Sequence, residues 1–410
     1  MKLGFFSDTH FGFAEGTERE GECFENAVEA LKICFDNHVD AILVSGDVFD
    51  EALPSPETLS RSFDVFLHAF RAPKSRVKIL VQTKHGEKEF SFSGIPIVAI
   101  HGNHDCRSIG KTNILEVFSK SGMLAYLYPG KAVIEKDGEK VFVHGFSAVP
   151  EKKARDVLSL WNPVAVSECT NVLLLHQTFK EYLPFQDDAM ASMSLEDLPK
   201  GFDLIVNGHL HWVDEHNLGD TLFLLNGSTV TTQMKKLEAE KQKGVFVFDT
   251  VSKKLGFFPL PNQRKLFYFD LKFEDAKPQE VIENARQALK SCAIGDNGLV
   301  PLARLKLSGS LSLGTSSLDV DLSEVLSEVK GRAIVSVSKN FFSNSFKKKI
   351  TDLRLAQKSK QSIASMGLEI LEKNLAETDF ADAFDAQEVF DLLSEDKLEE
   401  AAAAVLAKKT

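Results

Sequence analysis

Five short apolar segments of this chain, each of strand length, end in a cluster of polar residues. They lie at residues 3–6, 41–46, 95–100, 172–175 and 204–208. One such cluster is most simply a capped turn. A pattern repeated five times instead predicts strands that carry a site at their carboxyl ends, because ligands of α/β sheets bind beyond those ends.

Helical and strand-like patterns surround these segments. Residues 23–38, CFENAVEALKICFDNH, have apolar residues at helical spacing, which favours βα units around a central sheet. Residues 75–94 alternate apolar and polar residues on both sides of a His-Gly pair and predict a β-hairpin. Residues 222–261 hold several strand-like runs, and we expect them to complete a second sheet.

The chain changes character after residue 261. A strand–helix–strand–helix–strand pattern from about residue 264 predicts a small α+β domain. We therefore expect a first domain at 1–261, an α+β domain at 262–339, a basic linker at 340–362 and a helical tail at 363–410.

The predicted tail consists of short amphipathic helices. One of them has Asp385 as its expected N-cap, with Glu388 three positions later. Such helices bury too little apolar surface to form a core alone. They either fold back on their own domain or dock on a partner, and the basic linker before them favours docking.

Charge limits how the chain can bind a polyanion. The formal net charge of -11 argues against a generally basic surface. Local basic runs remain candidates, although solvated surface charge explains each of them equally well. They are Lys235, Lys236, Lys241 and Lys243, and a second run at 347–360.

The lengths of the apolar runs and the polar residues near the N-terminus indicate where the protein is located. None approaches the roughly 18 residues needed to cross a bilayer, and Asp8 and His10 come before any signal-peptide core. We therefore expect a cytoplasmic protein. The 5 cysteines are scattered, without a C-x-x-C pair, so we expect reduced thiols and neither a disulfide framework nor a cysteine zinc site.

The side chains at the five strand ends combine oxygen and nitrogen donors, which suits a pair of divalent first-row metal ions. One arrangement uses them fully, with Asp8, His10 and His211 on the first metal, Asn103, His176 and His209 on the second, and Asp47 bridging. Two carboxylates against two dications leave about two surplus positive charges, which favours an anionic substrate. The set predicts phosphoester hydrolysis.

Two more polar residues follow the third segment. His104 is placed to donate a proton to the leaving oxygen, and we expect Asp105 to hold the other ring nitrogen of His104. His101 and His144 are expected to be core histidines or to lie behind the metal ligands. Cys106 is expected to pack without binding metal, because the proposed ligand set contains no thiolate.

The motifs DTH, GDVFD, GNHD, LLLHQT and NGHLH occur in this order and resemble the five signatures of the calcineurin-like metallophosphoesterases. Within that superfamily, SDTHFG, GDVFDEALPSPETL, LHQTF and NGSTVTTQMKKLEAEKQKGVFVFD resemble the SbcD or meiotic-recombination-eleven nucleases of DNA double-strand-break repair. The resemblance covers nearly the whole chain and is strongest over residues 1–250.

This resemblance implies an α/β fold: a two-sheet αββα sandwich with a small α+β capping domain and a helical C-terminal tail. It implies a nuclease with two Mn²⁺ per chain, 3′-to-5′ exonuclease activity on duplex DNA and endonuclease activity on single strands. It also implies a homodimer that is associated with the nucleoid. The tail would bind a coiled-coil ABC ATPase of the SbcC type.

One position departs from many relatives, which carry a histidine where this chain has Asp50, although bacterial members have aspartate there. Asp50 is therefore expected beside the substrate, and the balance between exonuclease and endonuclease cutting stays open. Phosphoprotein phosphatases share the GD and GNH motifs, but they carry an arginine where this chain has Glu51. A non-catalytic scaffold is disfavoured because the sequence lacks none of the proposed metal ligands.

Overall fold

The computed structural model forms two compact units, which are described separately. The first comprises residues 1–269, 291–304 and 329–336, and the second comprises 270–290, 305–328 and 337–410. The structure describes residues 1–83, 86–108, 110–183, 193–295, 297–342, 368, 372, 385–394 and 397–406. The domain boundaries expected at residues 261, 339 and 362 stay a prediction.

The first sheet of the larger unit has the strand order β14-β13-β1-β2-β5-β6. Its parallel centre pairs β1 with β2, β2 with β5 and β5 with β6, whereas β13 runs antiparallel to β1. The strands are β1 (Lys2–Phe6), β2 (Ala41–Ser45), β5 (Ile97–Ile100), β6 (Ala125–Tyr126), β13 (Gly244–Asp249) and β14 (Lys254–Pro259).

The second sheet of this unit has the order β11-β12-β10-β9-β8-β7-β3-β4. Its centre is also parallel, since β9 pairs in parallel with both β8 and β10, and β10 with β12. The strands are β3 (Lys78–Thr83), β4 (Gly86–Phe90), β7 (Gly130–Lys136), β8 (Glu139–Phe146), β9 (Thr170–Leu175), β10 (Leu204–Asn207), β11 (Val213–Leu218) and β12 (Thr221–Asn226).

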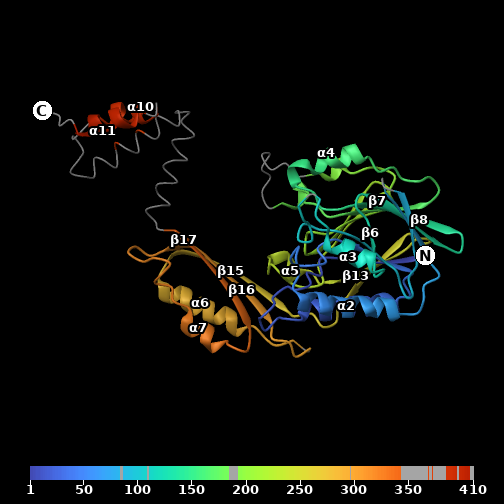
Figure 1. Cartoon of the computed structure of the whole chain (residues 1–410). Coiled ribbons are helices and arrows are strands. Elements are labelled where there is room, and N and C mark those ends of the chain that lie inside the picture. The colour runs from blue at the N-terminus through green and yellow to red at the C-terminus, as the bar shows by residue number, and fades with distance from the viewer. Residues whose placement is uncertain are drawn as a thin grey trace. The chain divides into compact units, whose positions relative to one another are not determined.

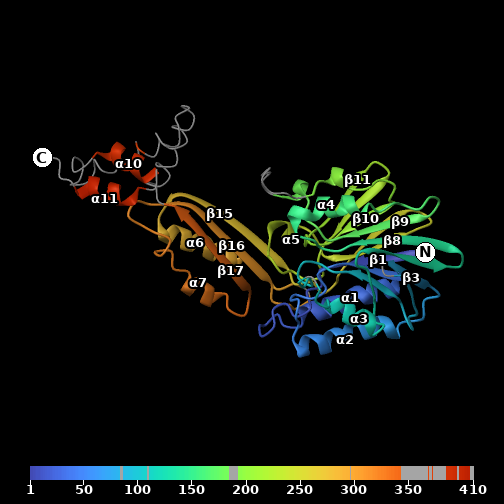
Figure 2. The same ribbon diagram turned by 45° about the horizontal axis from the view of Figure 1, so that its top comes forward.

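The two sheets pack face to face, and helices cover their outer faces (Figure 2). Alternate residues of one strand face the two sides, so that Leu3 and Phe5 pack between the sheets while Phe6 packs beneath the helices. Because both faces are covered, the central strands carry continuous apolar runs, such as residues 41–44 of β2 and 172–175 of β9. The helices are α1 (Glu22–Asp36), α2 (Pro56–Arg71) and α3 (Ile114–Lys120) on the first sheet, and α4 (Glu151–Trp161) on the second; η1 (Lys180–Tyr182), η2 (Leu195–Asp197) and α5 (Lys236–Glu240) are short.

The expected αββα sandwich is therefore confirmed, with two corrections. The five motif-bearing strands do not share one central sheet: β1, β2 and β5 lie in the first sheet, and β9 and β10 in the second. Strands β13 and β14 extend the first sheet instead of completing the second. A strand buried on both faces has the same apolar sequence pattern in either sheet, so the pattern could not show to which sheet each strand belongs.

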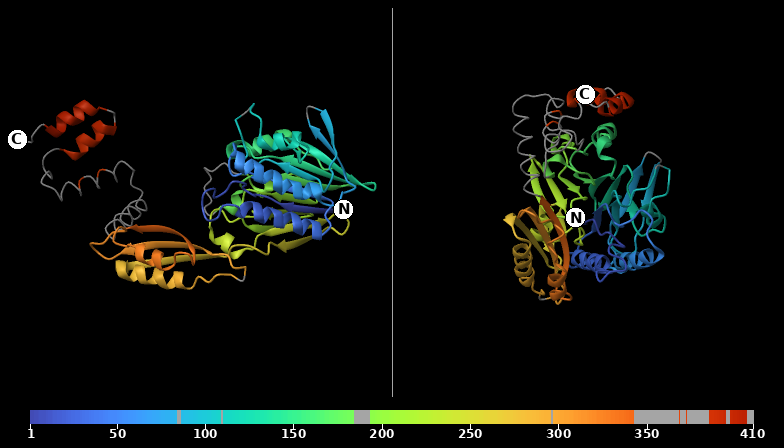
Figure 3. Two further views of the ribbon diagram at one scale, coloured as in Figure 1. Left: turned by 60° about the horizontal axis from the view of Figure 1, so that its bottom comes forward. Right: turned by 90° about the vertical axis from the view of Figure 1, so that its left-hand side faces the viewer.

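The predicted hairpin is confirmed, because β3 and β4 pair antiparallel at the edge of the second sheet. The small α+β region also has the predicted order of elements, and its sheet order is β15-β16-β17, with α6 along one face (Figures 1 and 3). The elements are β15 (Leu266–Ala276), α6 (Pro278–Lys290), β16 (Leu302–Leu311), α7 (Ser323–Glu328) and β17 (Ile334–Phe342).

Two helices of the expected tail are described, α10 (Ala386–Ser394) and α11 (Leu398–Leu406), and they contact each other. The Asp385 carboxylate accepts hydrogen bonds from the backbone N–H groups of Gln387 and Glu388, at 3.0 and 3.2 Å. Asp385 is therefore the N-cap, as predicted. The basic linker was expected from residue 340, but strand β17 continues to residue 342, and the rest of the linker lies outside the described residues. Of the helix expected at 363–371, only residue 368 is described. Among the described helices, none combines the length and apolarity that a membrane span requires.

A histidine in the core of the second sheet gives a test of the fold. His144 packs edge-on against the ring of Phe202, and its buried Nε2 has no hydrogen-bond partner. Burial lowers the pKa of His144 to about 4 from 6.5, so the folded state holds the ring neutral. The unfolded chain takes up a proton first as the pH falls, and stability is lost between these two values.

We expect the substitution His144→Phe to remove this loss. The free energy of unfolding of the unmodified chain should fall more steeply between pH 7 and pH 4 than that of the variant. Urea unfolding at pH 7 and pH 5 measures the difference. Parallel pH profiles for the two proteins would contradict this account of His144.

Candidate metal centre

The residues predicted to form a site lie in loops that follow the parallel strands of both sheets. Asp8 and His10 follow β1 and Asp47 follows β2, all in the first sheet. The loops after β9 and β10 of the second sheet meet them, since His176 Nε2 lies 3.1 Å from Asp47 Oδ2 and the backbone N–H of His209 donates to Asp8 Oδ1 at 3.0 Å. The carboxyl ends of the two sheets thus supply one site together.

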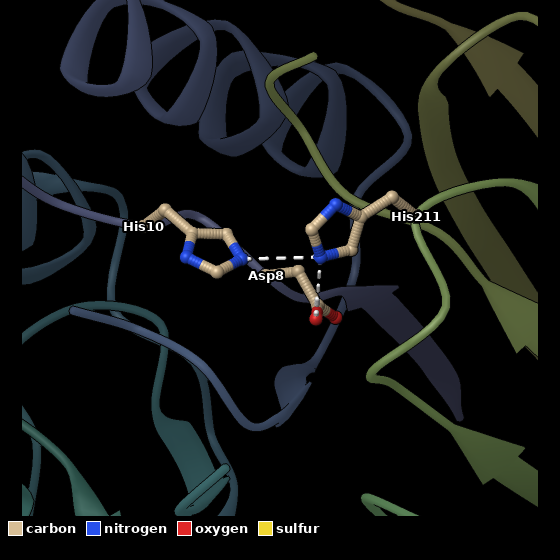
Figure 4. Close-up of side chains that lie close together, drawn as sticks. All are labelled: Asp8, His10 and His211. Carbon is tan, nitrogen blue, oxygen red and sulfur yellow. Dashed lines mark hydrogen bonds and ion pairs between the residues drawn. The ribbon is translucent and has the colours of Figure 1, made fainter. Parts of the chain in front are cut away.

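The first group of candidate ligands is Asp8, His10 and His211 (Figure 4). The Nε2 atoms of His10 and His211 lie 3.2 Å apart, and His211 Nε2 is 3.7 Å from Asp8 Oδ1. All three side chains are buried. Three donor atoms that converge in this way, away from water, are the arrangement expected of ligands around a cation.

A second group lies beside the first and comprises Asp47, His176 and His209. His176 Nε2 is 3.1 Å from Asp47 Oδ2 and 3.1 Å from Asn103 Oδ1. His209 Nδ1 is 2.9 Å from the same amide oxygen. The structure therefore brings Asn103 to this group, where the sequence analysis expected it among the ligands of the second metal.

Asp47 connects the two groups. Its carboxylate also belongs to a third set with His10 and His104, whose ligand atoms all lie within 4.8 Å of one another. Its Oδ1 accepts the backbone N–H of His104 at 2.8 Å. A carboxylate within reach of both His10 and His176 occupies the position that a bridging ligand requires.

The other ring nitrogen of three histidines is occupied. His10 Nδ1 contacts Asp50 Oδ1 at 2.9 Å and His176 Nδ1 contacts the Ser45 carbonyl oxygen at 2.8 Å, while His211 Nδ1 contacts the hydroxyl of Thr232 at 2.5 Å. If each Nδ1 carries the proton, as these partners favour, each Nε2 presents a lone pair to the centre. The donor set therefore fits divalent first-row metal ions.

The electrostatics of the site depend on burial and on close opposite charges. Burial raises the pKa of Asp8 to about 7. Burial alone would lower the pKa of His176, but Asp47 and Asp8 raise it to about 9. Burial also opposes the ionisation of Asp47, yet His176 and other histidines hold its pKa below the ordinary value. A nearby positive charge, such as that of protonated His176, therefore favours the ionised form of the buried Asp47 carboxylate.

The backbone at the site is strained. Four site residues have positive φ angles, a region that residues other than glycine rarely adopt. They are Asp8 (50°), His10 (46°), Asp47 (46°) and His209 (74°). Gly46 has a φ of 100°, and a Cβ there would overlap His176 Nδ1. The glycine of the GD motif is therefore required by both backbone conformation and space.

The predicted pairing of Asp105 with His104 is wrong. The buried Asp105 carboxylate accepts backbone N–H groups of Val48, Phe49 and Gly102 at 3.1, 2.8 and 3.0 Å. It thereby ties the loop after β2 to the loop after β5. His104 Nδ1 instead lies 2.7 Å from the backbone carbonyl oxygen of Asp50. The Asp105 carboxylate is therefore directed at the backbone of these loops and not at the ring of His104.

Asp50 therefore contacts two site histidines, one through its carboxylate and one through its carbonyl oxygen.

A cleft of about 330 Å³ opens beside the second group, and Cys106 lines it together with Asn103, His176 and His209. His101 lies behind the site, with Nδ1 2.6 Å from the Tyr126 hydroxyl. The sequence did not reveal that the Thr232 hydroxyl and the Ser45 carbonyl oxygen contact site histidines. No local pattern distinguishes a hydroxyl or a backbone carbonyl group that contacts a histidine far away in the sequence.

The chain matches the calcineurin-like phosphoesterase family over residues 1–213. It belongs to this family. The chain is 26% identical to the double-strand break repair protein MRE11 of Encephalitozoon cuniculi, over 78% of this chain and 56% of that protein. It is 25% identical to the DNA double-strand break repair protein Mre11 of Thermoplasma acidophilum, over 77% of this chain and 79% of that protein.

The corresponding protein of Sulfolobus acidocaldarius is 26% identical, over 76% of each chain. The chain thus spans little more than half of the Encephalitozoon cuniculi relative but about three quarters of the other two. These relatives confirm the resemblance to Mre11-type repair proteins that the motifs indicated.

Proposed function

We propose that the chain is a metal-dependent DNA nuclease of the Mre11 and SbcD type, acting in double-strand-break repair. The observation that carries this proposal is the pair of adjoining ligand groups joined by Asp47. The names of the relatives supply the substrate class. The activities that follow are 3′-to-5′ exonuclease action on duplex DNA and endonuclease action on single strands.

In this proposal Asp8, His10 and His211 would hold one Mn²⁺ ion, Asn103, His176 and His209 would hold the other, and Asp47 would contribute to both. Such a metal pair would supply polarisation of the phosphodiester and a lowered pKa for the attacking water. The chain contributes the positions of the ligands and a proton for the leaving oxygen. His104 supplies that proton in this proposal, and its ring is oriented by the Asp50 carbonyl oxygen at 2.7 Å.

The proposed function is tested by comparing two substrates with the purified chain and Mn²⁺. A nuclease should digest end-labelled linear duplex DNA efficiently and hydrolyse p-nitrophenyl phosphate poorly. The reverse preference would favour the alternative, a phosphatase that acts on phosphoproteins or other phosphomonoesters. A chain inactive on both, with two bound metals, would instead favour a scaffold.

The proposed assembly is a homodimer that binds a coiled-coil ABC ATPase of the SbcC type through its C-terminal helices. Support comes from the two contacting helices α10 and α11, which expose apolar side chains such as Leu393 and Leu398. These helices are short, and their apolar faces suit helix-in-groove binding.

A chain that ends at Lys360 should keep its nuclease activity on simple substrates and lose co-purification with the ATPase. The reason is that the expected catalytic residues all lie before residue 212, whereas the helices lie after residue 385. Co-expression and pull-down measure binding, and digestion of labelled duplex measures activity. Unfolding or aggregation of the shortened chain would show that the tail belongs to the core.

A further inference from the structure

A buried ion pair lies next to the first ligand group. The sequence left two roles open for Lys243, binding of a polyanion or solvated surface charge, and both are wrong, because its side chain is only 4% exposed. Its Nζ lies 3.1 Å from Glu238 Oε1, and the side chain of Glu238 is fully buried. A buried ammonium cannot contact DNA, so its role must lie inside the fold.

All three hydrogen atoms of the Lys243 ammonium have acceptors within reach. Besides Glu238, Nζ donates to the backbone carbonyl oxygen of His211 at 2.9 Å and to the Ser228 hydroxyl at 2.6 Å. Glu238 is fixed in turn, because its Oε2 accepts the backbone N–H of Lys235 at 3.2 Å. The lysine is thus held in one position and holds the backbone of His211.

His211 is also held at its ring. Its Nδ1 lies 2.5 Å from the Thr232 hydroxyl and 3.9 Å from Glu238 Oε1. Its Nε2 faces His10 and Asp8. His211 is therefore fixed at two points, its carbonyl oxygen and its Nδ1, on the side away from the candidate metal position.

The topology explains why His211 needs such support. Its loop follows β10 of the second sheet, whereas Asp8 and His10 follow β1 of the first sheet. Lys243 directly precedes β13, which pairs with β1. The contact of Lys243 with the His211 carbonyl oxygen therefore joins the loop after β10 of the second sheet to the start of β13 in the first sheet. His211 is the residue that extends from the second sheet toward Asp8 and His10 of the first.

Stability alone does not account for a charged pair at this place. Replacing a buried ion pair by apolar residues of similar volume is often neutral or stabilising. We propose that Lys243, Glu238 and Thr232 are positioning residues that fix His211 as a ligand of the first metal. This inference rests on the proposed function, because it needs the metal centre to exist.

Thr232 gives the sharpest test, because two small substitutions distinguish the effect of its hydroxyl group from the effect of its side-chain volume. Thr232→Val keeps the volume and removes the partner of His211 Nδ1, whereas Thr232→Ser keeps the hydroxyl. Isothermal titration of the chelator-stripped full chain with Mn²⁺ should show one of two sites weakened about 10- to 100-fold in Thr232→Val. Thr232→Ser should bind both ions as the unmodified chain does.

The ion pair is tested by Lys243→Met combined with Glu238→Gln, which leaves no unpaired buried charge. This double variant should also weaken one Mn²⁺ site about 10- to 100-fold. Lys136→Met is the matched control, since it breaks the Lys136–Asp40 pair (2.6 Å), which joins strand β7 to the start of β2. The control should bind both ions normally even if its melting temperature falls.

The outcomes separate the two proposals. Normal Mn²⁺ affinity at both sites in Thr232→Val and in the double variant would overturn the positioning role. If the double variant does not fold, the Thr232 pair decides alone. Failure of the unmodified chain to bind two Mn²⁺ ions would overturn the metal centre itself, and with it the proposed function.

Discussion

Replacing Asp47 with alanine should abolish Mn²⁺-dependent cleavage of duplex DNA. Asp47 is the carboxylate that reaches both ligand groups, with Oδ2 3.1 Å from His176 Nε2 and a shared set with His10. Its loss removes a ligand from both proposed metals and their common spacing. The effect should therefore exceed the about 10- to 100-fold loss that follows removal of an outer partner of a metal ligand.

The fold of the Asp47→Ala variant should survive, because the strands around the loop are held by the apolar cores of the two sheets. Asp47→Asn is the matched control, since asparagine tolerates the positive φ of 46° at this position and keeps one ligand oxygen. Circular dichroism reports the fold, elemental analysis the metal content and labelled duplex the rate. An Asp47→Ala protein that digests duplex at a near-normal rate would refute the two-metal assignment.

The positions of the site residues could be predicted from the sequence because of a general rule. Polar side chains directly after apolar strands gather at the carboxyl edge of a parallel sheet. The rule explains why Asp8 and Asp47 lie at one edge of the first sheet, whereas Asp8, His10 and His211 come together because the carboxyl ends of the two sheets meet, which the local pattern did not predict. The order of the motifs and the elements of the small α+β region were equally readable, because periodicity marks strands and helices locally.

Contacts between elements could not be predicted in the same way. Asp105 was expected to pair with a ring but accepts three backbone N–H groups, and only the path of the loop after β2 decides this. Lys243 sits in a run of lysines that looks like solvated surface, yet it is buried against Glu238. Both errors concern side chains whose partners are far away in sequence, where local patterns carry no information.

The second large effect is expected for His104→Gln, and it separates a proton donor from a metal ligand. The side chain of His104 is 41% exposed, whereas that of His176 is fully buried. Its Nδ1 is occupied by the Asp50 carbonyl oxygen at 2.7 Å, so its Nε2 is the atom free to meet a substrate. Losing a positioned acid typically slows a reaction about 10²- to 10⁴-fold.

His104→Gln should therefore bind two Mn²⁺ ions per chain, bind DNA nearly as well as the unmodified chain and cut far more slowly. His176→Gln is the comparison, because it should lose one ion together with activity. The test is necessary because His104 also lies within ligand distance of Asp47 and His10. If His104→Gln loses an ion while His176→Gln keeps both, the two roles are reversed, and His104 is a metal ligand through the group that it forms with Asp47 and His10.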